Sequence, residues 1–441
     1  MSPTFLPISL LLCVSPSAFF EDFDDALPNI VLIVSDDAGY ADFSFQGSEA
    51  MRTPHIDSIA ARGVRFAQGY VTASVCSPSR AGLLTGRYQQ RFGHEHNFPS
   101  NSKESIGLPV EERTLADALD ESGYRTIAMG KWHLGYGPAL HPLERGFDEF
   151  FGFLQGSRSY WPIQGTPRNR LQRDGDAVEE DFAYMTDLLG AEAARSIERC
   201  SEEPFFLYLS FNAVHTPMHA LEGDLLEVRG PTDRRRRILA AMTAALDRAV
   251  GRVLEALRSN DLDERTLVVF VNDNGGAWNN SSSNAPLRGT KGTPFEGGIR
   301  VPFLMQWPDV LPGGVTYDKP VSTLDIFATV TAAVGSPAPE RPLDGVDLVP
   351  FLTERTDAPH RELFWRRKKN FAARVDDWKL VVYKAKPAML FNILADEREE
   401  HDLAGQHPDV VEHLSARYAA WEAEMIPPRW ASSAVDPKPG R

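Results

Sequence analysis

Four short apolar runs, each followed at once by polar side chains, constrain the fold of this chain most strongly. The runs cover residues 30–34, 126–129, 205–211 and 267–271. Strands that are apolar throughout are typical of a parallel sheet with helices on both faces. In such α/β sheets, ligands bind at the carboxyl ends of the strands. The pattern predicts an α/β fold with a large, mostly parallel mixed sheet, flanked by helices, and a functional site at one edge.

Two helices are predicted between these runs. Apolar residues recur at three- and four-residue steps over residues 233–258, which is the period of a helix packed along one face. A shorter helix is predicted over residues 114–122, just before the second apolar run.

The chain changes character after Pro337, where closely spaced prolines predict a connecting segment. Short antiparallel strands are expected beyond it, over residues 362–366, 371–375 and 380–382. A closing helix is expected over residues 408–424. We therefore predict a main α/β domain over residues 26–340 and a small C-terminal α+β subdomain over residues 341–441.

The first 25 residues are interpreted separately. Residues 5–20 form an apolar stretch broken by two prolines, and no Lys or Arg precedes Arg52. At about sixteen residues the stretch is too short for a membrane span. It is closer to the apolar core of a secretory signal, with a disordered N-terminal extension as the alternative. We therefore expect a periplasmic or secreted protein with no membrane span.

The charge balance excludes some ligand classes. Lys and Arg number 46 against 61 Asp and Glu, a formal net charge of −15, which argues against nucleic acid as a partner. The three cysteines are too few for a disulfide framework. An anionic ligand would need positive charge concentrated in one site.

Oxygen-bearing side chains follow two of the apolar runs. Asp36 and Asp37 follow the first, and Asp273 and Asn274 follow the last. Carboxylate and amide oxygens suit a hard divalent cation, calcium or magnesium, and no Cys/His cluster has zinc spacing. For Asp36 and Asp37 alone, helix capping is the alternative.

Cys76 stands in the segment Cys-Ser-Pro-Ser-Arg-Ala-Gly-Leu-Leu-Thr-Gly. Pro78 restrains a turn, and a helix is expected from Arg80 onward. A cysteine just before a helix start lies at the positive end of the helix, which favours a thiolate and bound anions. The alternative is a buried cysteine that acts as a small apolar residue.

Residues 76–80, Cys-Ser-Pro-Ser-Arg, resemble the signature of type I sulfatases, in which the cysteine is converted to formylglycine by a separate enzyme. Residues 123–133 resemble the second signature of that family. The resemblance runs from Asn29 to about Glu424 and includes the Asp-Asp and Asn-Asp-Asn-Gly segments. It implies the alkaline-phosphatase-like fold, with bacterial polysaccharide sulfatases as the similar members.

The resemblance also implies roles. One calcium ion would be held by Asp36, Asp37, converted Cys76, Asp273 and Asn274. The catalytic residues would be Cys76, Arg80, Lys131, His133, His215 and Lys291. A hydroxyl of the formylglycine hydrate would attack the sulfur, while Lys291 and His215 lie near the leaving oxygen. His133 would then deprotonate the second hydroxyl and so expel sulfate. A formylglycine-generating enzyme is the implied maturation partner.

Two stretches with aromatic and basic residues are predicted to line the mouth of the site. The candidates for substrate binding are His94, His96, Arg158, Tyr160 and Trp161. Rings and cationic groups suit the apolar faces and sulfates of a sulfated sugar. Core packing and hydrogen bonding to loop carbonyls are the alternatives. The similarity to bacterial polysaccharide sulfatases implies a sulfated carbohydrate, with a galactose-type glycan as the leading expectation.

Three other functions remain open at this level. One is a phosphonate or phosphate ester hydrolase of the same superfamily. Another is a non-catalytic protein that binds sulfated glycans, which would follow if Cys76 were not converted. The last is a thiol hydrolase that uses Cys76 with His133 or His215, although it leaves the acidic cluster without a role.

Overall fold

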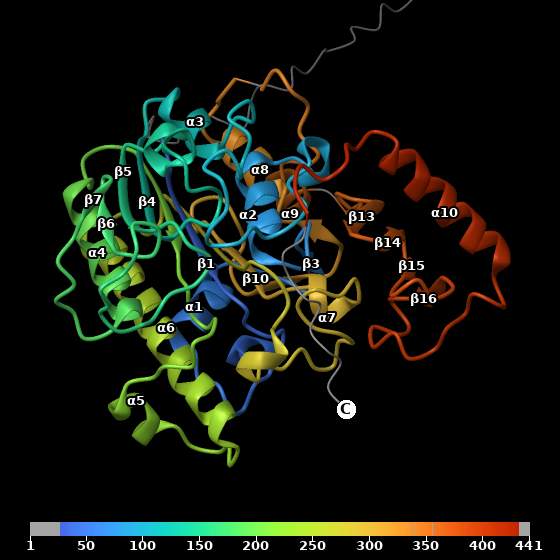
Figure 1. Cartoon of the computed structure of the whole chain (residues 1–441), viewed down its shortest axis with the longest axis horizontal. Coiled ribbons are helices and arrows are strands. Elements are labelled where there is room, and N and C mark those ends of the chain that lie inside the picture. Colours follow the sequence, from blue (N-terminus) through green and yellow to red (C-terminus); the bar gives the residue numbers. More distant parts are fainter. Residues whose placement is uncertain (1–26, 338, 355, 432–441) are drawn as a thin grey trace, which may run out of the picture.

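The computed structural model describes residues 27–431, apart from residues 338 and 355 (Figure 1). The predicted signal segment, residues 1–25, therefore lies outside the described residues. Within the described part of the chain, no helix combines the length and apolar character needed to cross a membrane.

The four apolar runs form four neighbouring parallel strands at the centre of a ten-stranded sheet. In spatial order they are β9 (Thr266–Asn272), β1 (Asn29–Ser35), β8 (Phe205–Ser210) and β4 (Arg125–Lys131). Beyond β9 lie β10 (Phe303–Gln306), β2 (Val64–Phe66) and β11 (Val315–Tyr317), and beyond β4 lie β5 (Glu149–Phe153), β6 (Gln172–Arg173) and β7 (Asp176–Ala177). The predicted mixed, mostly parallel sheet is confirmed.

Helices cover both faces of this sheet (Figure 1). Because side chains alternate along a strand, Val31 and Ile33 of β1 pack on one face, and Ile30, Leu32 and Val34 pack on the other. The first face carries α1 (Pro54–Arg62), α4 (Met185–Arg199) and α6 (Arg234–Ser259). The second carries α2 (Cys76–Thr85), α3 (Leu115–Asp120) and α8 (Asp325–Ala333). Both predicted helices are present, as α6 and α3, and both faces of the central strands are buried.

Shorter elements fill the connections. They are the helices α5 (Glu222–Glu227), α7 (Glu296–Ile299) and α9 (Val349–Thr353), and a two-stranded sheet of β3 (Gly69–Tyr70) and β12 (Val321–Ser322). Single 3₁₀ turns occur at Ser44–Gln46, Gln89–Phe92, Pro138–Leu140, Pro142–Glu144 and Trp278–Asn280.

The C-terminal region contains an antiparallel sheet followed by a helix. Its elements are β13 (Glu362–Arg367), β14 (Asn370–Val375), β15 (Trp378–Val382), β16 (Met389–Asn392) and α10 (Pro408–Glu422). The three predicted strands and the helix are confirmed, whereas β16 was not predicted. The exact boundary at residue 340 stays a prediction.

The C-terminal region contacts loops of the main α/β region through the indole groups of two tryptophans. Trp365 donates its indole N–H to the carbonyl of Val71 at 2.7 Å. After α10 the chain returns toward the main sheet, where Trp430 donates to the carbonyl of His96 at 3.0 Å. The C-terminal region therefore contacts the segment that precedes Cys76 and the segment that follows α2.

Candidate active site

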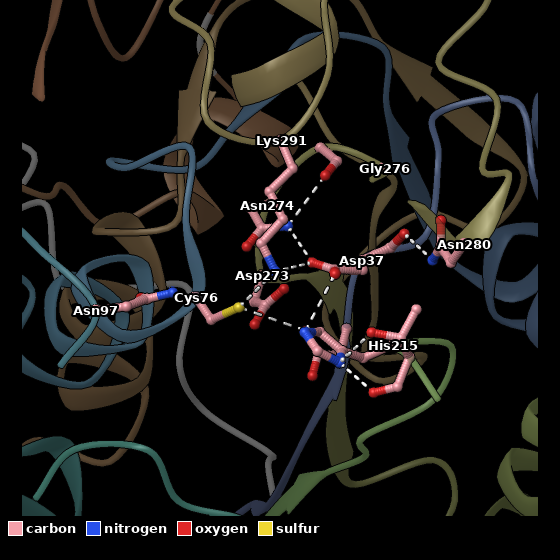
Figure 2. Close-up of polar contacts among 12 residues, drawn as sticks. Asp37, Cys76, Asn97, His215, Asp273, Asn274, Gly276, Asn280 and Lys291 are labelled. Atoms are coloured by element: carbon pink, nitrogen blue, oxygen red, sulfur yellow. Dashed lines mark hydrogen bonds and ion pairs between the residues drawn. The ribbon is translucent and has the colours of Figure 1, made fainter. Parts of the chain in front are cut away.

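The candidate site lies where the central strands end (Figure 2). Asp36 and Asp37 directly follow β1, Lys131 is the last residue of β4, and Asp273 directly follows β9. Because these strands are parallel and adjacent, their carboxyl ends meet at one edge and bring these side chains together. Helix α2 begins at Cys76 and brings its thiol into the same group. The predicted meeting of strand ends is confirmed.

Each of the three carboxylates faces a cation. Lys131 donates to Asp36 at 2.5 Å, and Lys291 donates to Asp37 at 2.5 Å. Both Nε and a terminal nitrogen of Arg80 lie 2.9 Å from Asp273 Oδ2. All three carboxylates are buried. Buried charges are stable only when they are paired and hydrogen-bonded, so this arrangement predicts tightly held side chains.

Lys291 and Asp37 are charged in this arrangement. Burial by itself raises the pKa of Asp37, but the charge and hydrogen bond of Lys291 bring that pKa below its usual range. Burial by itself lowers the pKa of Lys291, but the neighbouring Asp37 and Cys76 raise it well above its usual range. Lys291 is therefore a partly buried ammonium group that holds its proton strongly.

The Cys76 thiol lies between two of these pairs. It accepts a hydrogen bond from Lys291 Nζ at 3.0 Å, and its Sγ lies 3.7 Å from Asp36 Oδ1, to which it donates. Burial raises the pKa of Cys76 to about 12. The expectation of a thiolate at the helix start is therefore wrong, because desolvation outweighs the nearby lysines. The helix also begins at Cys76 itself, four residues earlier than predicted.

The oxygen-rich group fits a cation. Ligand atoms of Asp36, Asp37, Cys76 and His215 lie within 4.8 Å of one another. Buried Asp273 Oδ1 and Asn274 Oδ1 have no hydrogen-bond partner. Asn274 instead donates its amide nitrogen to Asp37 Oδ1 at 2.8 Å. Two buried oxygen atoms without donors, next to a cluster of carboxylates, are what a metal ion bound by oxygens requires.

The two predicted catalytic histidines are neutral. Burial, followed by the charge of Lys131, lowers the pKa of His133 well below its usual value. Burial lowers the pKa of His215 to about 4, although Asp37 opposes this shift from a distance of 3.5 Å. His133 also has a buried Nδ1 without a partner. At neutral pH, His133 is therefore an imidazole without an added proton.

Three of the predicted substrate-binding residues are buried and bonded to other parts of the protein. His94 is fully buried, and its Nε2 lies 2.6 Å from Ser77 Oγ. Tyr160 is also fully buried, and its hydroxyl donates to the carbonyls of Asn212 at 2.6 Å and His215 at 2.9 Å. The guanidinium of Arg158 has no exposed surface and pairs with Glu180 at 2.6 Å. Tertiary packing therefore gives each of the three a protein partner, and contact with substrate stays a prediction for them.

The other two predicted substrate residues lie apart from each other. Trp161 is partly buried and stacks on His219 with ring centroids 5.8 Å apart. His96 is 5% exposed, beside the returning C-terminal segment. A role in substrate binding stays a prediction for both.

The sequence analysis missed Asn97, which supports the start of α2. Its side-chain oxygen accepts the backbone N–H of Ser77 at 3.0 Å, as the capping residue of a helix does. A capping residue is normally sought directly before its helix, and Asn97 lies beyond the end of α2. No local signal could have indicated this contact.

The sulfatase family model matches residues 28–336. This chain belongs to the sulfatase family. The resemblance recognised at residues 76–80 and 123–133 is thereby confirmed, and sulfatases are sulfuric ester hydrolases. The N-acetylgalactosamine-6-sulfatase of Canis lupus familiaris is 35% identical over 358 residues, which cover 75% of this sulfatase and 67% of the relative. Arylsulfatase J of Mus musculus is 29% identical over an alignment of 463 positions, gaps included, which covers 91% of this sulfatase and 77% of the relative.

Solved structures support the same family. The crystal structure of Ps i-CgsB in complex with k-i-k-neocarrahexaose is 36% identical, with a TM-score of 0.88 over 92% of this sulfatase and 94% of that chain. The phosphonate monoester hydrolase of Agrobacterium radiobacter is 21% identical, with a TM-score of 0.68 over 90% and 96%. The second likeness shows a common fold only.

Proposed function

We propose that this sulfatase hydrolyses sulfate esters of a sulfated carbohydrate, using a formylglycine made from Cys76 and one bound calcium ion. The observation that carries the proposal is the position of Cys76, whose Sγ lies beside Asp36 and Lys291 within the oxygen-rich cluster. A relative named N-acetylgalactosamine-6-sulfatase and a similar structure solved in complex with k-i-k-neocarrahexaose support a glycan substrate.

The calcium ion would be held by oxygens of Asp36, Asp37, Asp273, Asn274 and residue 76. Calcium accepts more oxygen ligands than magnesium, and with less strict geometry, so this large set favours calcium. When bound, the ion would offset negative charge on the sulfate and favour ionisation of a neighbouring hydroxyl.

Lys131 and Lys291 would hold sulfate oxygens. Both are cationic side chains beside residue 76, one from β4 and one from the loop before α7. Preorganised cations stabilise charge that develops on the transferred group. Lys291 is protonated at neutral pH, carries the positive charge that His215 lacks and lies 3.0 Å from Sγ, so it would be the group that donates to the leaving alcohol. His215, which is neutral, would instead accept or donate a hydrogen bond to the substrate.

His133 would act as the base that ends the reaction. When residue 76 is a formylglycine hydrate, it would supply one hydroxyl as the nucleophile and a second hydroxyl as the group to be deprotonated for release of sulfate. His133 is neutral and has a buried Nδ1 without a partner, so it can accept that proton. Arg80 would position residue 76 indirectly, because it binds Asp273 and the carbonyl of Lys131 at 3.2 Å.

The alternatives differ in what supports them. The raised pKa of Cys76 argues against a thiol hydrolase, because the nucleophilic thiolate is scarce.

Maturation by a formylglycine-generating enzyme and export to the periplasm or medium belong to the same proposal. Both would be tested on protein recovered from the periplasm and the culture medium of an expressing bacterial host.

The deciding experiment starts with the mass of the peptide that contains residue 76, from protein made together with a formylglycine-generating enzyme. An aldehyde or its hydrate, with sulfate release from neocarra-oligosaccharides or N-acetylgalactosamine-6-sulfate, supports the proposal. Cys76→Ala, prepared in parallel, should release no sulfate. Preferred hydrolysis of a phosphonate monoester by converted protein would overturn it in favour of the phosphonate hydrolase. Tight glycan binding by converted protein without sulfate release would identify a binding protein.

A further inference from the structure

The turn between β13 and β14 carries concentrated positive charge. Residues 366–369 are Arg-Arg-Lys-Lys, in a chain whose formal net charge is −15. The other run of four basic residues, 234–237, begins α6. In the first run Arg366 pairs with Glu95 and also lies 3.3 Å from Glu422. Arg367, Lys368 and Lys369 follow directly in the sequence, and Lys368 and Lys369 are exposed at the tip of the hairpin.

This tip adjoins the loop that carries Lys291. Arg367 donates to the carbonyl of Gly292 at 3.1 Å, and Gly292 donates its N–H to the carbonyl of Ser74 at 2.7 Å. Lys291 in turn contacts the Cys76 thiol. Arg367 is therefore connected to the reacting residue through one loop, although the two are far apart in the chain.

The segment of His96 and Asn97, which follows α2, also lies near the hairpin. The pKa of His96 is lowered to about 4, first by burial and then by the charge of Arg367, with smaller contributions from Lys368 and Arg366. The next residue, Asn97, accepts the N–H of Ser77. The hairpin therefore lies near both the loop of Gly292 and the segment of His96 and Asn97.

Turn chemistry does not explain the two lysines. Arg367 pairs with Asn370, so Lys368 and Lys369 form a two-residue hairpin turn. Lys368 has φ of +57°, in the left-handed region that glycine adopts without cost. A side chain there costs on the order of 1 kcal/mol. A lysine at this position is therefore better explained by its charge than by its backbone.

We propose that Arg367, Lys368 and Lys369 bind a second anionic group, a sulfate or carboxylate on a neighbouring sugar, while the reacting sulfate occupies the site at residue 76. This inference rests on the proposed function and narrows its substrate to polyanionic glycans. The inference rests on charge complementarity between the hairpin and an anionic glycan, because the hairpin is cationic, exposed and adjacent to the loop that carries Lys291. A substrate with a single sulfate and no further anion would not reach the hairpin.

The test compares one substrate of each kind on converted enzyme. The first is 4-nitrophenyl sulfate, which has one sulfate, and the second is the sulfated k-i-k-neocarrahexaose. Lys368→Glu/Lys369→Glu should lower the ratio of kcat/KM for the hexasaccharide to kcat/KM for the aryl sulfate by about tenfold at low salt. The matched control is Arg195→Glu/Arg258→Glu, which makes the same charge change on exposed parts of α4 and α6 and should leave the ratio unchanged.

A second variant separates binding from folding. Lys368→Gly/Lys369→Asn places turn-favouring residues at the same positions, so it should raise Tm while it still lowers the ratio. The inference is overturned if both hairpin variants keep the wild-type ratio. Binding of a dextran sulfate oligosaccharide can also be measured directly on Cys76→Ala protein, which does not turn over substrate. The two hairpin changes should weaken this binding. If the hairpin changes weaken this binding but the converted wild-type enzyme hydrolyses no sulfate ester, the hairpin site is supported and the proposed function is refuted.

Discussion

Lys379 joins the C-terminal sheet to the catalytic loop through a buried group of charges. Its ammonium lies 2.7 Å from Glu296 and 2.9 Å from Glu399, and none of the three side chains is exposed. Glu296 is the first residue of α7, just after the loop that carries Lys291. Tyr70 donates its hydroxyl to the second oxygen of Glu296 at 2.7 Å. Removing the ammonium alone would leave two buried carboxylates next to each other.

The expected cost of Lys379→Met follows from this geometry. Removing one partner of a buried ion pair typically costs about 3–5 kcal/mol. An unfolding entropy of about 2.1 cal/mol/K per residue gives about 0.9 kcal/mol/K for a chain of this length, so Tm should fall by about 3–5 °C. The assay is thermal unfolding, together with urea unfolding at a fixed temperature.

The pH dependence has a definite sign. Burial raises the pKa of Glu399 to about 7, while Lys379 opposes this shift. Without Lys379, the folded protein binds a proton on these carboxylates more tightly than the unfolded chain does. Stability then decreases as pH rises above the pKa of an unfolded glutamate, near 4.3. The deficit of the variant should therefore be larger at about pH 8 than at about pH 5.

Two further variants make the reasoning refutable. Lys386→Met removes an exposed lysine from the segment after β15 and should change stability by less than about 0.5 kcal/mol. Lys379→Met/Glu399→Gln should recover much of the lost stability, because only one buried carboxylate remains. The reasoning is refuted if Lys379→Met loses no more stability than Lys386→Met, or if its deficit shrinks as pH rises.

Three more predictions concern the site and its support. Calcium at about 100 times its Kd should stabilise the protein by about 2.7 kcal/mol, and Asp273→Ala should abolish both this calcium-dependent rise in Tm and the activity, as calorimetry and sulfate release will show. Tyr160→Phe removes the hydroxyl that bonds the carbonyls of Asn212 and His215, so steady-state kinetics should show a lower kcat with little change in KM. A rise in KM alone would indicate substrate contact instead. Asp247 accepts the N–H groups of His55 and Ile56 at the start of α1, so Asp247→Ala should cost about 1–3 kcal/mol in urea unfolding. Burial raises the pKa of Asp247 to about 6, above that of an unfolded aspartate. The contribution of Asp247 to stability therefore falls as pH rises from about 4 to about 6. Asp247→Asn should remove that pH dependence.

Much of the fold could be predicted because its central strands carry their own signal. A strand buried on both faces must be apolar throughout, so Val31 and Leu32 alike had to be hydrophobic. The strand β16 was missed because one short, half-buried edge strand has little pattern of its own. Its place depends on pairing with β15, a contact made only in the folded chain.

The candidate site could be predicted to the same extent. Asp36, Asp37 and Asp273 were found because they directly follow apolar strands, and parallel strands bring such positions together. Cys76 was found from a compact motif. By contrast, the exposure of His94 and Tyr160 could not be predicted, because aromatic and polar residues in a loop serve equally well as ligands or as packing.

The sequence by itself therefore determined the sheet, the family and the residues at the strand ends, since each depends on neighbouring residues in the chain. Only the tertiary structure decided the protonation states and the supporting contacts. The thiol of Cys76 is protonated because the fold buries it, and Lys291 stays charged because the fold places Asp37 at 2.5 Å. Burial and electrostatic interaction depend on residues that are distant in the chain, so no local pattern contains them.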